Sequence, residues 1–276
     1  MMSTLKYSDF KINPIFPEII TSKVESLEQK CTPHLHLDYD ITFVTSGILK
    51  LQLGDSTRFY HEGQFCLLNP ATVHHGEGVG DKPLSIKNIK VSPAQMLQVM
   101  KLNNPENTQY PAFDSSPIFD RSLNQIFQHF FDLLRADTCQ YQAISDEGWR
   151  FLQTLVNYAS FPSSKSSDVS LDLPFEIRIM KDKIREKLKI PELAQKMNLS
   201  EHYFIKKFKR LYGITPYHFF MQLKLETAFR ELLKQQEIQK VAYDFGYSDQ
   251  AHFTRLIKKH YGYNPRAIGN LLKSHS

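Results

Sequence analysis

Three histidines and one aspartate in the first third of the chain have types and spacing that suit a small binding site. His34 and His36 are two residues apart, Asp40 follows four residues later, and His74 comes further along the chain. On a strand, residues two apart point to one face, and imidazoles beside a carboxylate suit Fe, Mn, Ni or Zn. The same four residues could instead bind a small organic effector, or hydrogen-bond one another inside the fold. The residue types leave these three interpretations open.

Short strands must position these four residues. β-branched, aromatic and alternating apolar residues occur in brief runs, which Gly and Pro punctuate. This spacing is typical of an antiparallel sandwich or barrel, which we expect over residues about 10–100. Arg58, Tyr60 and Asn88 are further candidates for contacts with a carboxylate or hydroxyl group of a ligand. The clearest runs are 41–45, 48–53, 58–60 and 65–68.

The residues from about 117 to 160 change to a helical period. Apolar side chains recur at intervals of three and four, which indicates one face of a helix, and a second helical stretch covers about Asp146–Ala159. So wide an aromatic stripe fits core packing, and we expect part of it to form the helix–helix contact of a homodimer. The stripe consists of Phe119, Leu123, Ile126, Phe127, Phe130, Phe131 and Leu134.

The composition is that of an ordinary folded protein. Its 276 residues are enough for about two domains, and the 41% of hydrophobic residues can form a sizeable core. The longest apolar runs are too short to cross a bilayer, and the first residues lack the apolar segment of a secretory signal. Three distant cysteines, Cys31, Cys66 and Cys139, argue against a disulfide framework. We therefore expect a cytoplasmic protein that does not enter a membrane.

Charge divides the chain into an acidic and a basic part. Residues 1–162 hold 13 Lys and Arg against 17 Asp and Glu, and residues 163–276 hold 21 against 12. The resulting charges are −4 and +9, and such asymmetry suggests a polyanionic partner for the basic part. Residues 163–174, rich in Ser, Asp and Pro, are typical of a linker. We expect one domain at 1–162 and a second at 175–276.

The basic part repeats one pattern twice. Ala194 matches Ala242 at an offset of 48 residues, and Gly213 matches Gly262 at an offset of 49. In each copy a short helix with a small alanine is followed by a turn, a second helix and a glycine suited to a left-handed C-cap. This is the organisation of a helix-turn-helix unit, present twice.

Local signals mark the ends of these helices. Ser200 and Ser248 follow the two turns, and we expect them to cap the second helices. The turns hold Asn198 and Gly246, the residue types that best tolerate a left-handed backbone. A Thr-Pro pair at 215–216 suits the start of a long connecting helix.

The second helix of each unit carries the residues that would contact DNA. Side chains near its start suit the edges of bases in the major groove, and basic residues near its end suit phosphates. If both units face the same way, these helices enter adjacent major grooves about 34 Å apart. A helical bundle with a solvated basic face is the alternative. The base-reading candidates are His202, Ile205, Lys206, Gln250, Ala251, Thr254 and Arg255, the phosphate candidates are Lys207, Lys209, Arg210, Lys258 and Lys259, and the residues expected to point inward are Phe204, Phe208, Phe253 and Ile257.

With these motifs the basic part resembles the DNA-binding domain of the AraC family of bacterial transcription regulators, over about 175–270. The chain has Ile257 where the family usually has Phe, and Asn264 where Thr is common. The resemblance implies sequence-specific binding to double-stranded promoter DNA and activation of transcription, with RNA polymerase as a partner. It rests on Leu193-Ala194, Ser200, Phe208-Lys209, residues 213–216 and Leu225, and then on Val241-Ala242, residues 246–249, His252-Phe253, Arg255, Lys258-Lys259, Gly262 and Pro265.

The front of the chain resembles the cupin-like effector domain of the same family. Asp40 stands where the family pattern usually has Glu. The resemblance implies a barrel whose residues His34, His36, Asp40 and His74 contact a small-molecule effector, without a metal or other cofactor. The whole chain is then an α+β protein: an antiparallel β-barrel with flanking helices, a linker, and an all-α domain with two helix-turn-helix units. The matching positions are Pro33-His34, His36, Tyr39-Asp40, Gly47, Gly63, Pro70 and His74.

The sequence therefore favours a transcription regulator, not an enzyme, that responds to a small effector in the barrel. Effector binding would alter the orientation or the dimer pairing of the DNA-binding part through the 117–160 helices. One alternative is a metal-dependent cupin enzyme with a nucleic-acid-binding tail. Another is a regulator without a small ligand, which is controlled by its abundance or by a protein partner.

Overall fold

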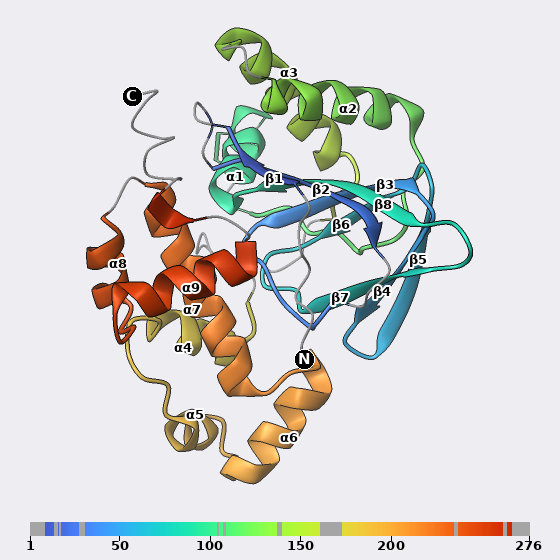
Figure 1. The fold of residues 1–276 in the computed structure, drawn as a ribbon. Coiled ribbons are helices and arrows are strands. Elements are labelled where there is room, and N and C mark those ends of the chain that lie inside the picture. Colours follow the sequence, from blue (N-terminus) through green and yellow to red (C-terminus); the bar gives the residue numbers. More distant parts are fainter. Residues whose placement is uncertain are drawn as a thin grey trace.

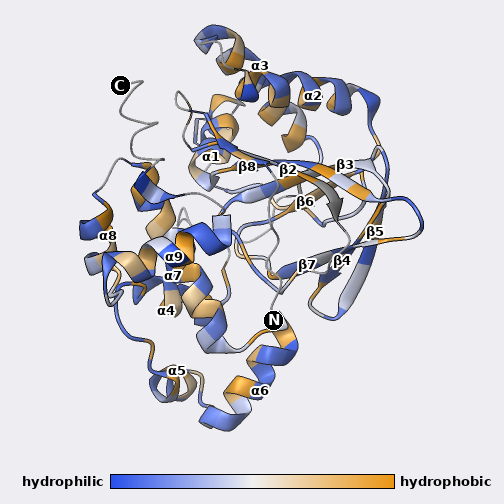
Figure 2. Ribbon diagram, viewed as in Figure 1, coloured by the Kyte–Doolittle hydropathy of each residue, from blue (hydrophilic) through white to orange (hydrophobic). Residues whose placement is uncertain are grey.

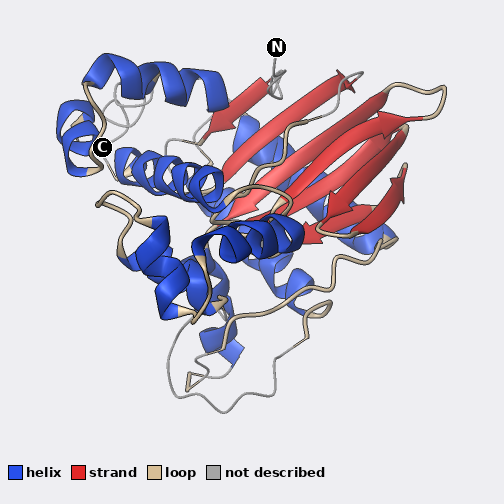
Figure 3. Ribbon diagram, turned by 90° about the horizontal axis from the view of Figure 1, so that it is seen from below, coloured by secondary structure: helices blue, strands red, loops and turns tan. Residues whose placement is uncertain are grey.

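Strands come first along the chain and helices last (Figure 1). Figure 3 shows the strands gathered in one block, with helices outside it. This arrangement confirms the predicted α+β order of a strand-rich front and a helical last third. The computed structural model describes residues 9–13, 16, 18–27, 31–103, 105–106, 109–136, 140–160, 173–234, 237–261 and 264–266.

Two antiparallel sheets form the front of the molecule, and we call the two together the barrel. One has the strand order β1-β2-β8-β3-β6 and the other β5-β4-β7. All four runs that the sequence singled out lie in strands, and further strands complete both sheets. The bounds are β1 Asp9–Ile12, β2 Ile20–Leu27, β3 Tyr39–Ser46, β4 Ile48–Leu53, β5 Ser56–His61, β6 Phe65–Leu68, β7 His74–Val79 and β8 Leu84–Val91.

The connection from β3 to β4 shows how the local sequence sets this fold. Gly47 has φ of 77°, and a Cβ atom there would lie 2.8 Å from the carbonyl oxygen of Pro83, so a side chain does not fit. Beyond the turn, Leu49 and Leu51 alternate with less buried residues and point into a core between the two sheets. This alternation follows from the pleat of a strand with one buried face.

Helices α1 (Pro93–Asn103), α2 (Arg121–Arg135) and α3 (Tyr141–Val156) accompany the sheets. Figure 2 shows hydrophobic and hydrophilic residues interleaved along α2 and α3, as in amphipathic helices. All stripe residues within α2 are buried in a core shared with β3, β6 and β8. Phe119 is the exception: it precedes the N-cap Asp120 and is 65% exposed.

Six helices follow in the last third of the described chain, and they share one apolar core. That core also contains residues of the front part, among them Phe10, Leu35 and Val73. The linker expected at 163–174 lies outside the described residues except for its last two positions. None of the described helices is long and apolar enough to cross a bilayer. The bounds are α4 Phe175–Asp182, α5 Ile190–Lys196, α6 Glu201–Tyr212, α7 Pro216–Leu233, α8 Ile238–Asp244 and α9 Gln250–Tyr261.

Candidate functional site

The first helix-turn-helix unit consists of α5 and α6. Asn198 in the turn between them has φ of 55°. The Oγ of Ser200 accepts a hydrogen bond from the backbone N–H of Tyr203 at 3.4 Å. Gly213 ends α6 in the left-handed conformation, with φ of 75°. The turn, the N-cap and the C-cap predicted for this unit are therefore all confirmed.

The second unit consists of α8 and α9, and its cap differs from the prediction. Gly246 in the turn has φ of 64°. The cap of α9 is Asp249, whose Oδ1 accepts a hydrogen bond from the backbone N–H of His252 at 2.6 Å. The prediction of Ser248 is wrong because this turn is one residue longer, which also explains the change of the repeat offset from 48 to 49. Ser248 instead donates its hydroxyl to Asp249 at 3.2 Å.

Helix α7 connects the two units. Thr215 caps it by accepting a hydrogen bond from the backbone N–H of His218 at 3.3 Å, and Pro216 is its first residue. Its buried residues, such as Phe219 and Phe229, belong to the same core as residues of α5, α6, α8 and α9. Packing against α7 therefore fixes how the two units are oriented relative to each other.

The DNA-contact candidates lie on the outer faces of α6 and α9. The four residues predicted to point inward, Phe204, Phe208, Phe253 and Ile257, are at most 2% exposed. Ile205, Lys207, Gln250 and Thr254 are half-buried, and the other candidates are exposed; these are His202, Lys206, Lys209, Arg210, Ala251, Arg255, Lys258 and Lys259.

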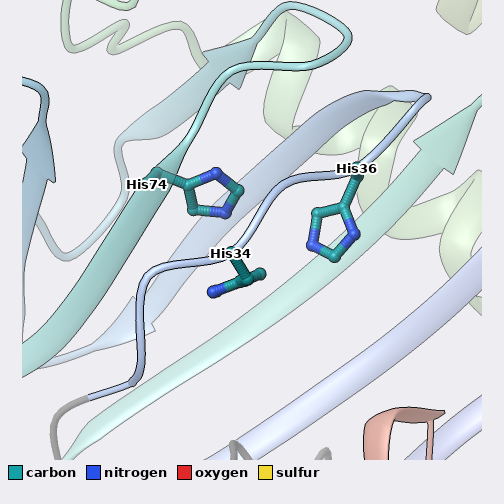
Figure 4. A group of neighbouring side chains, drawn as sticks. All are labelled: His34, His36 and His74. Atoms are coloured by element: carbon teal, nitrogen blue, oxygen red, sulfur yellow. The ribbon is translucent and has the colours of Figure 1, made fainter. Parts of the chain in front are cut away.

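In the barrel, His34 and His74 lie close together (Figure 4). Their backbones exchange hydrogen bonds of 2.9 and 2.8 Å, and their ring centroids are 4.4 Å apart. Each Nδ1 pairs with a carbonyl oxygen two residues back, of Thr32 or Thr72. A carbonyl only accepts, so Nδ1 carries the proton and Nε2 is left as an acceptor. Burial lowers the pKa of both imidazoles, which are therefore neutral at pH 7.

His36 is not on a strand with His34. The chain pairs at a single bridge between His34 and His74, and regular pairing of β3 begins only at Tyr39. The prediction that the His-x-His pair lies on one face of a strand is therefore wrong. The ring of His36 is still only 5.0 Å from that of His34, centroid to centroid.

Asp40 belongs to a buried polar network in the barrel. One of its oxygens accepts hydrogen bonds from the hydroxyl of Thr42 at 2.8 Å and from the amide of Asn88 at 2.5 Å. Burial alone would raise the pKa of Asp40, but Lys90 and His36 outweigh this effect and hold the pKa below its ordinary value. The carboxylate is therefore ionised at neutral pH.

A cavity of about 50 Å³ lies beside these residues. Three of the four effector candidates line it, whereas His36 does not, and neither do Arg58 and Tyr60. The hydroxyl of Tyr60 instead donates to the backbone carbonyl of Ser115 at 2.5 Å. The polar end of the cavity is formed by His34, Asp40, His74 and Asn88.

His36 faces the DNA-binding helices instead. Its Nδ1 lies 3.2 Å from Oε1 of Glu226 on α7, and its Nε2 lies 2.9 Å from Nζ of Lys90. Tyr261, at the end of α9, donates its hydroxyl to the same oxygen of Glu226 at 2.6 Å. Burial and, next, Lys90 lower the pKa of His36 to about 4. We call His36, Lys90, Glu226 and Tyr261 the interdomain cluster, because they join the barrel to α7 and α9.

Further contacts surround the interdomain cluster. Arg230 of α7 forms an ion pair with the buried Asp38, just before β3. Phe10 of β1 packs against Phe229 and Tyr261, whose rings stack with centroids 3.8 Å apart. Polar and apolar groups thus fasten the barrel to the same two helices.

No local pattern in the sequence links His36 to Glu226, which lies 190 residues away. The one signal is inside α7, where Lys224 and Glu226 are both buried in a largely apolar helix. Buried charges need partners, so they indicate contacts outside the helix. Lys224 donates to the backbone carbonyl of Glu186 at 2.8 Å, and Glu226 reaches the barrel.

The histidines suggest a metal site by type, but their surroundings do not fit one. Two sets of described side chains bring possible ligand atoms within 4.8 Å of one another, and both include His36. The ring nitrogens of His36 lie within 3.0 Å of Nζ of Lys90, so an ion coordinated by His36 would lie directly against this ammonium group and be repelled by it. The two sets are His34, His36 and His74, and His36, Glu226 and His260.

Two family matches span both parts of the chain. Residues 16–152 match the AraC-like ligand binding domain, and residues 193–270 match a helix-turn-helix domain. The first match covers all strands from β2 to β8 together with α1 and α2, and the second covers α6 to α9. The barrel and the repeated units are thus matched separately.

Relatives and solved structures agree with these matches. An uncharacterized HTH-type transcriptional regulator of Bacillus subtilis, YbfI, is 23% identical over 83% of this chain and 84% of its own length. The HTH-type transcriptional activator RhaS of Escherichia coli is 29% identical over 32% of each chain. The structure of ToxT from Vibrio cholerae with a bound unsaturated fatty acid matches with a TM-score of 0.51 and 13% identity over 99% of both chains, which shows a shared fold. This chain belongs to the AraC family of transcription regulators, with an N-terminal ligand-binding domain and a C-terminal helix-turn-helix domain.

Proposed function

We propose that this regulator binds a promoter sequence with both helix-turn-helix units, and that a small molecule in the barrel cavity controls this binding. The observation that carries the proposal is the interdomain cluster. Its members His36 and Lys90 lie beside the residues of the cavity, and its members Glu226 and Tyr261 belong to helices of the DNA-binding part.

The DNA contacts are assigned by position along α6 and α9. Residues near the start and middle of each helix read base edges, and basic residues toward the end of each helix bind phosphates. The effector-binding part is 1–162, the linker 163–174 and the DNA-binding part 175–276. The proposed base readers are His202, Ile205, Lys206, Gln250, Ala251, Thr254 and Arg255, and the proposed phosphate contacts are Lys207, Lys209, Arg210, Lys258 and Lys259.

The effector acts on the interdomain cluster through Asp40. This residue lines the cavity with His34 and His74, and its second oxygen lies 3.8 Å from Nε2 of His36. A ligand that takes up or screens the charge of Asp40 changes the field at Lys90 and His36. The contact with α7 and α9 responds, and the equilibrium between orientations of the DNA-binding part shifts.

A homodimer through the 117–160 helices is part of the proposal. The aromatic stripe of α2 is buried within its own chain, so the partner would meet outer residues, such as the exposed Phe119 and Tyr141. Strand β1 offers a connection from α2 to the DNA-binding part. Lys11 donates to the carbonyl of Arg135 at 2.5 Å, and Phe10 on the same strand packs against α7.

The regulator activates transcription and has RNA polymerase as a partner. It acts in the cytoplasm. The name of RhaS, an activator, supports this direction. The proposed chemistry is reversible binding, and no residue is assigned a catalytic role.

Two experiments test the proposal. Selection from a random pool of double-stranded DNA should enrich a motif with two contacted segments, and recovery of unenriched sequence would contradict sequence-specific binding. A thermal-shift screen of small metabolites should find a compound that raises the melting temperature. If no compound does, control by abundance or by a protein partner becomes the better explanation.

A further inference from the structure

The chemistry of the cavity defines a class of effector, and this step rests on the proposed regulatory function. We infer that the barrel cavity binds a small organic ammonium ion with a compact apolar body. Its ammonium group is held by Asn88, His34, His74 and Asp40 at the polar end of the cavity.

Asn88 lines the cavity and holds a buried acceptor. Its Nδ2 donates to Asp40, to the hydroxyl of Thr42 and to the carbonyl of Ile41, at 2.5, 2.8 and 3.3 Å. These partners fix the orientation of the amide, because Thr42 already donates its own proton to Asp40. Oδ1 is then buried with no hydrogen-bond donor among the described residues, on a side chain that is 3% exposed. A buried acceptor without a donor is unfavourable, so this oxygen favours a ligand that donates.

The two histidines add acceptors to the same end. The Nδ1 atoms of His34 and His74 are paired with backbone carbonyls, at 2.8 and 2.9 Å, so each neutral ring offers Nε2 as an acceptor. These two Nε2 atoms and the carboxylate of Asp40 make the polar end of the cavity rich in lone pairs. An ammonium group, which has three donors and no lone pair, complements it.

The charges nearby favour a cation over an anion. Asp40 and Glu226 carry two negative charges within this buried network, and Lys90, whose pKa is lowered by burial, supplies at most one positive charge. A bound ammonium ion balances the remaining negative charge, whereas a carboxylate would add another and would face Asp40 and the acceptor atoms of Asn88, His34 and His74. The cavity is therefore unsuited to a carboxylate head group such as that of the unsaturated fatty acid in the ToxT structure.

The rest of the cavity sets the body of the ligand. The aliphatic wall of this cavity of about 50 Å³ is formed by Leu49, Leu51, Leu68 and Ile86. A short branched hydrocarbon packs against such a wall and brings no polar groups that would need partners. Isobutylamine and isovalerate share this body and carry opposite head groups, which makes them a matched pair of probes.

The test is calorimetric titration of the full-length protein without DNA, at about pH 7.5, where the amine is protonated. Isobutylamine should bind at least about tenfold more tightly than isovalerate, because only the amine supplies donors. Asn88→Leu should lose about tenfold in affinity for the amine. Gln98→Ala, which alters a separate cavity beside α1 and α3, should bind it like the wild type.

Three results would overturn the inference: equal or tighter binding of isovalerate, binding of neither probe at millimolar concentration, or a visible Co(II) band that His34→Gln abolishes. The last result would assign the same lone pairs to a metal ion. The comparison of the two probes uses the wild type, so it stands even if a variant misfolds. DNA selection is measured separately, so failure here leaves the DNA-binding proposal intact.

Discussion

Glu226 is the residue on which the contact between the barrel and the DNA-binding helices depends. It is 4% exposed, accepts a hydrogen bond from the hydroxyl of Tyr261 and faces His36 and Lys90. Burial alone would raise its pKa, but His260, His36 and Lys90 hold the pKa well below its ordinary value. The carboxylate is thus a buried charge whose partners come from two parts of the chain.

Removal of this carboxylate should be strongly destabilising. In Glu226→Ala the hydroxyl of Tyr261 loses its acceptor and Lys90 loses a facing negative charge, so the free energy of unfolding should fall by about 3–5 kcal/mol. Urea unfolding measures this free energy. Glu231→Ala, on the same helix with a surface partner in Lys234, should change it by less than about 0.5 kcal/mol. Equal stability of the two variants would show that the interdomain cluster contributes nothing.

His36 should make the stability depend on pH. Its pKa is about 4 in the folded protein, against 6.5 for the free imidazole. Between these values the unfolded chain binds a proton that the folded chain does not, so stability falls as the pH is lowered from 6.5 to 4. This residue alone contributes a slope of about 1.4 kcal/mol per pH unit. The charged groups that face it are Lys90, Asp40 and Glu226, and the neutral imidazoles of His34 and His74 lie beside it.

The variant His36→Gln isolates this contribution. His34 and His74 also have lowered pKa values, so some dependence on pH should persist. The slope of unfolding free energy against pH should nevertheless become shallower in the variant. An unchanged slope would mean that His36 titrates alike in the folded and unfolded chain.

Arg255 and Lys258 should differ in their effect on DNA binding. Both are exposed, and they lie near the middle and toward the end of α9. Arg255→Ala should lose about 1–3 kcal/mol of discrimination at one base position. Lys258→Ala should weaken binding to all sequences alike and should reduce the slope of log affinity against log salt concentration by about 1. Titrations against single-base variants of the selected site separate the two effects. A uniform loss in Arg255→Ala would assign this residue to phosphate.

At the level of elements, the strands and helices with strong local signals were predictable. The alternation of Leu49 and Leu51 and the stop at Gly54 define β4, and Ser200 with Gly213 brackets α6. These signals are local, because each reports the pleat or the cap of its own element. The sequence places the second helical stretch less well: it indicates a start near Asp146, whereas α3 begins at Tyr141, where no side chain caps it.

The polar clusters were less predictable, because they depend on contacts between distant segments. The His-x-His spacing suggested a strand, but a single bridge to His74 decides where His34 lies. The distinct surroundings of His36 arise from Glu226, which no period or motif connects to it. Residue types thus indicated a polar site, whereas tertiary contacts divide it into a cavity and an interdomain cluster.

The cap of α9 offers a test at this scale. Asp249 accepts the hydrogen bond from the backbone N–H of His252, and Ser248 does not. Asp249→Ala should therefore fray the start of α9 and lower the melting temperature more than Ser248→Ala does. Thermal unfolding followed by circular dichroism compares the melting temperatures of the two variants. A larger loss in Ser248→Ala would restore the cap predicted from the repeat.

At the scale of the whole molecule, the barrel touches both DNA-contact helices. Tyr261 of α9 joins the interdomain cluster. The tip of the β4–β5 hairpin lies close to α6: a Cβ atom on Gly54 would be only 3.2 Å from the carbonyl oxygen of Leu211. Apolar residues of the barrel also share one core with the helices. A change in the barrel can therefore reach both units at once.

The most direct test of a two-unit DNA reader is a hydroxyl-radical footprint of the full-length protein on its selected site. Because α6 and α9 belong to separate units fixed on α7, each monomer should protect two successive major grooves, about 34 Å apart, on one face of the duplex. Arg255→Ala should weaken only the segment that α9 contacts. Protection of a single groove, or equal protection of unrelated DNA at physiological salt, would contradict sequence reading by both units.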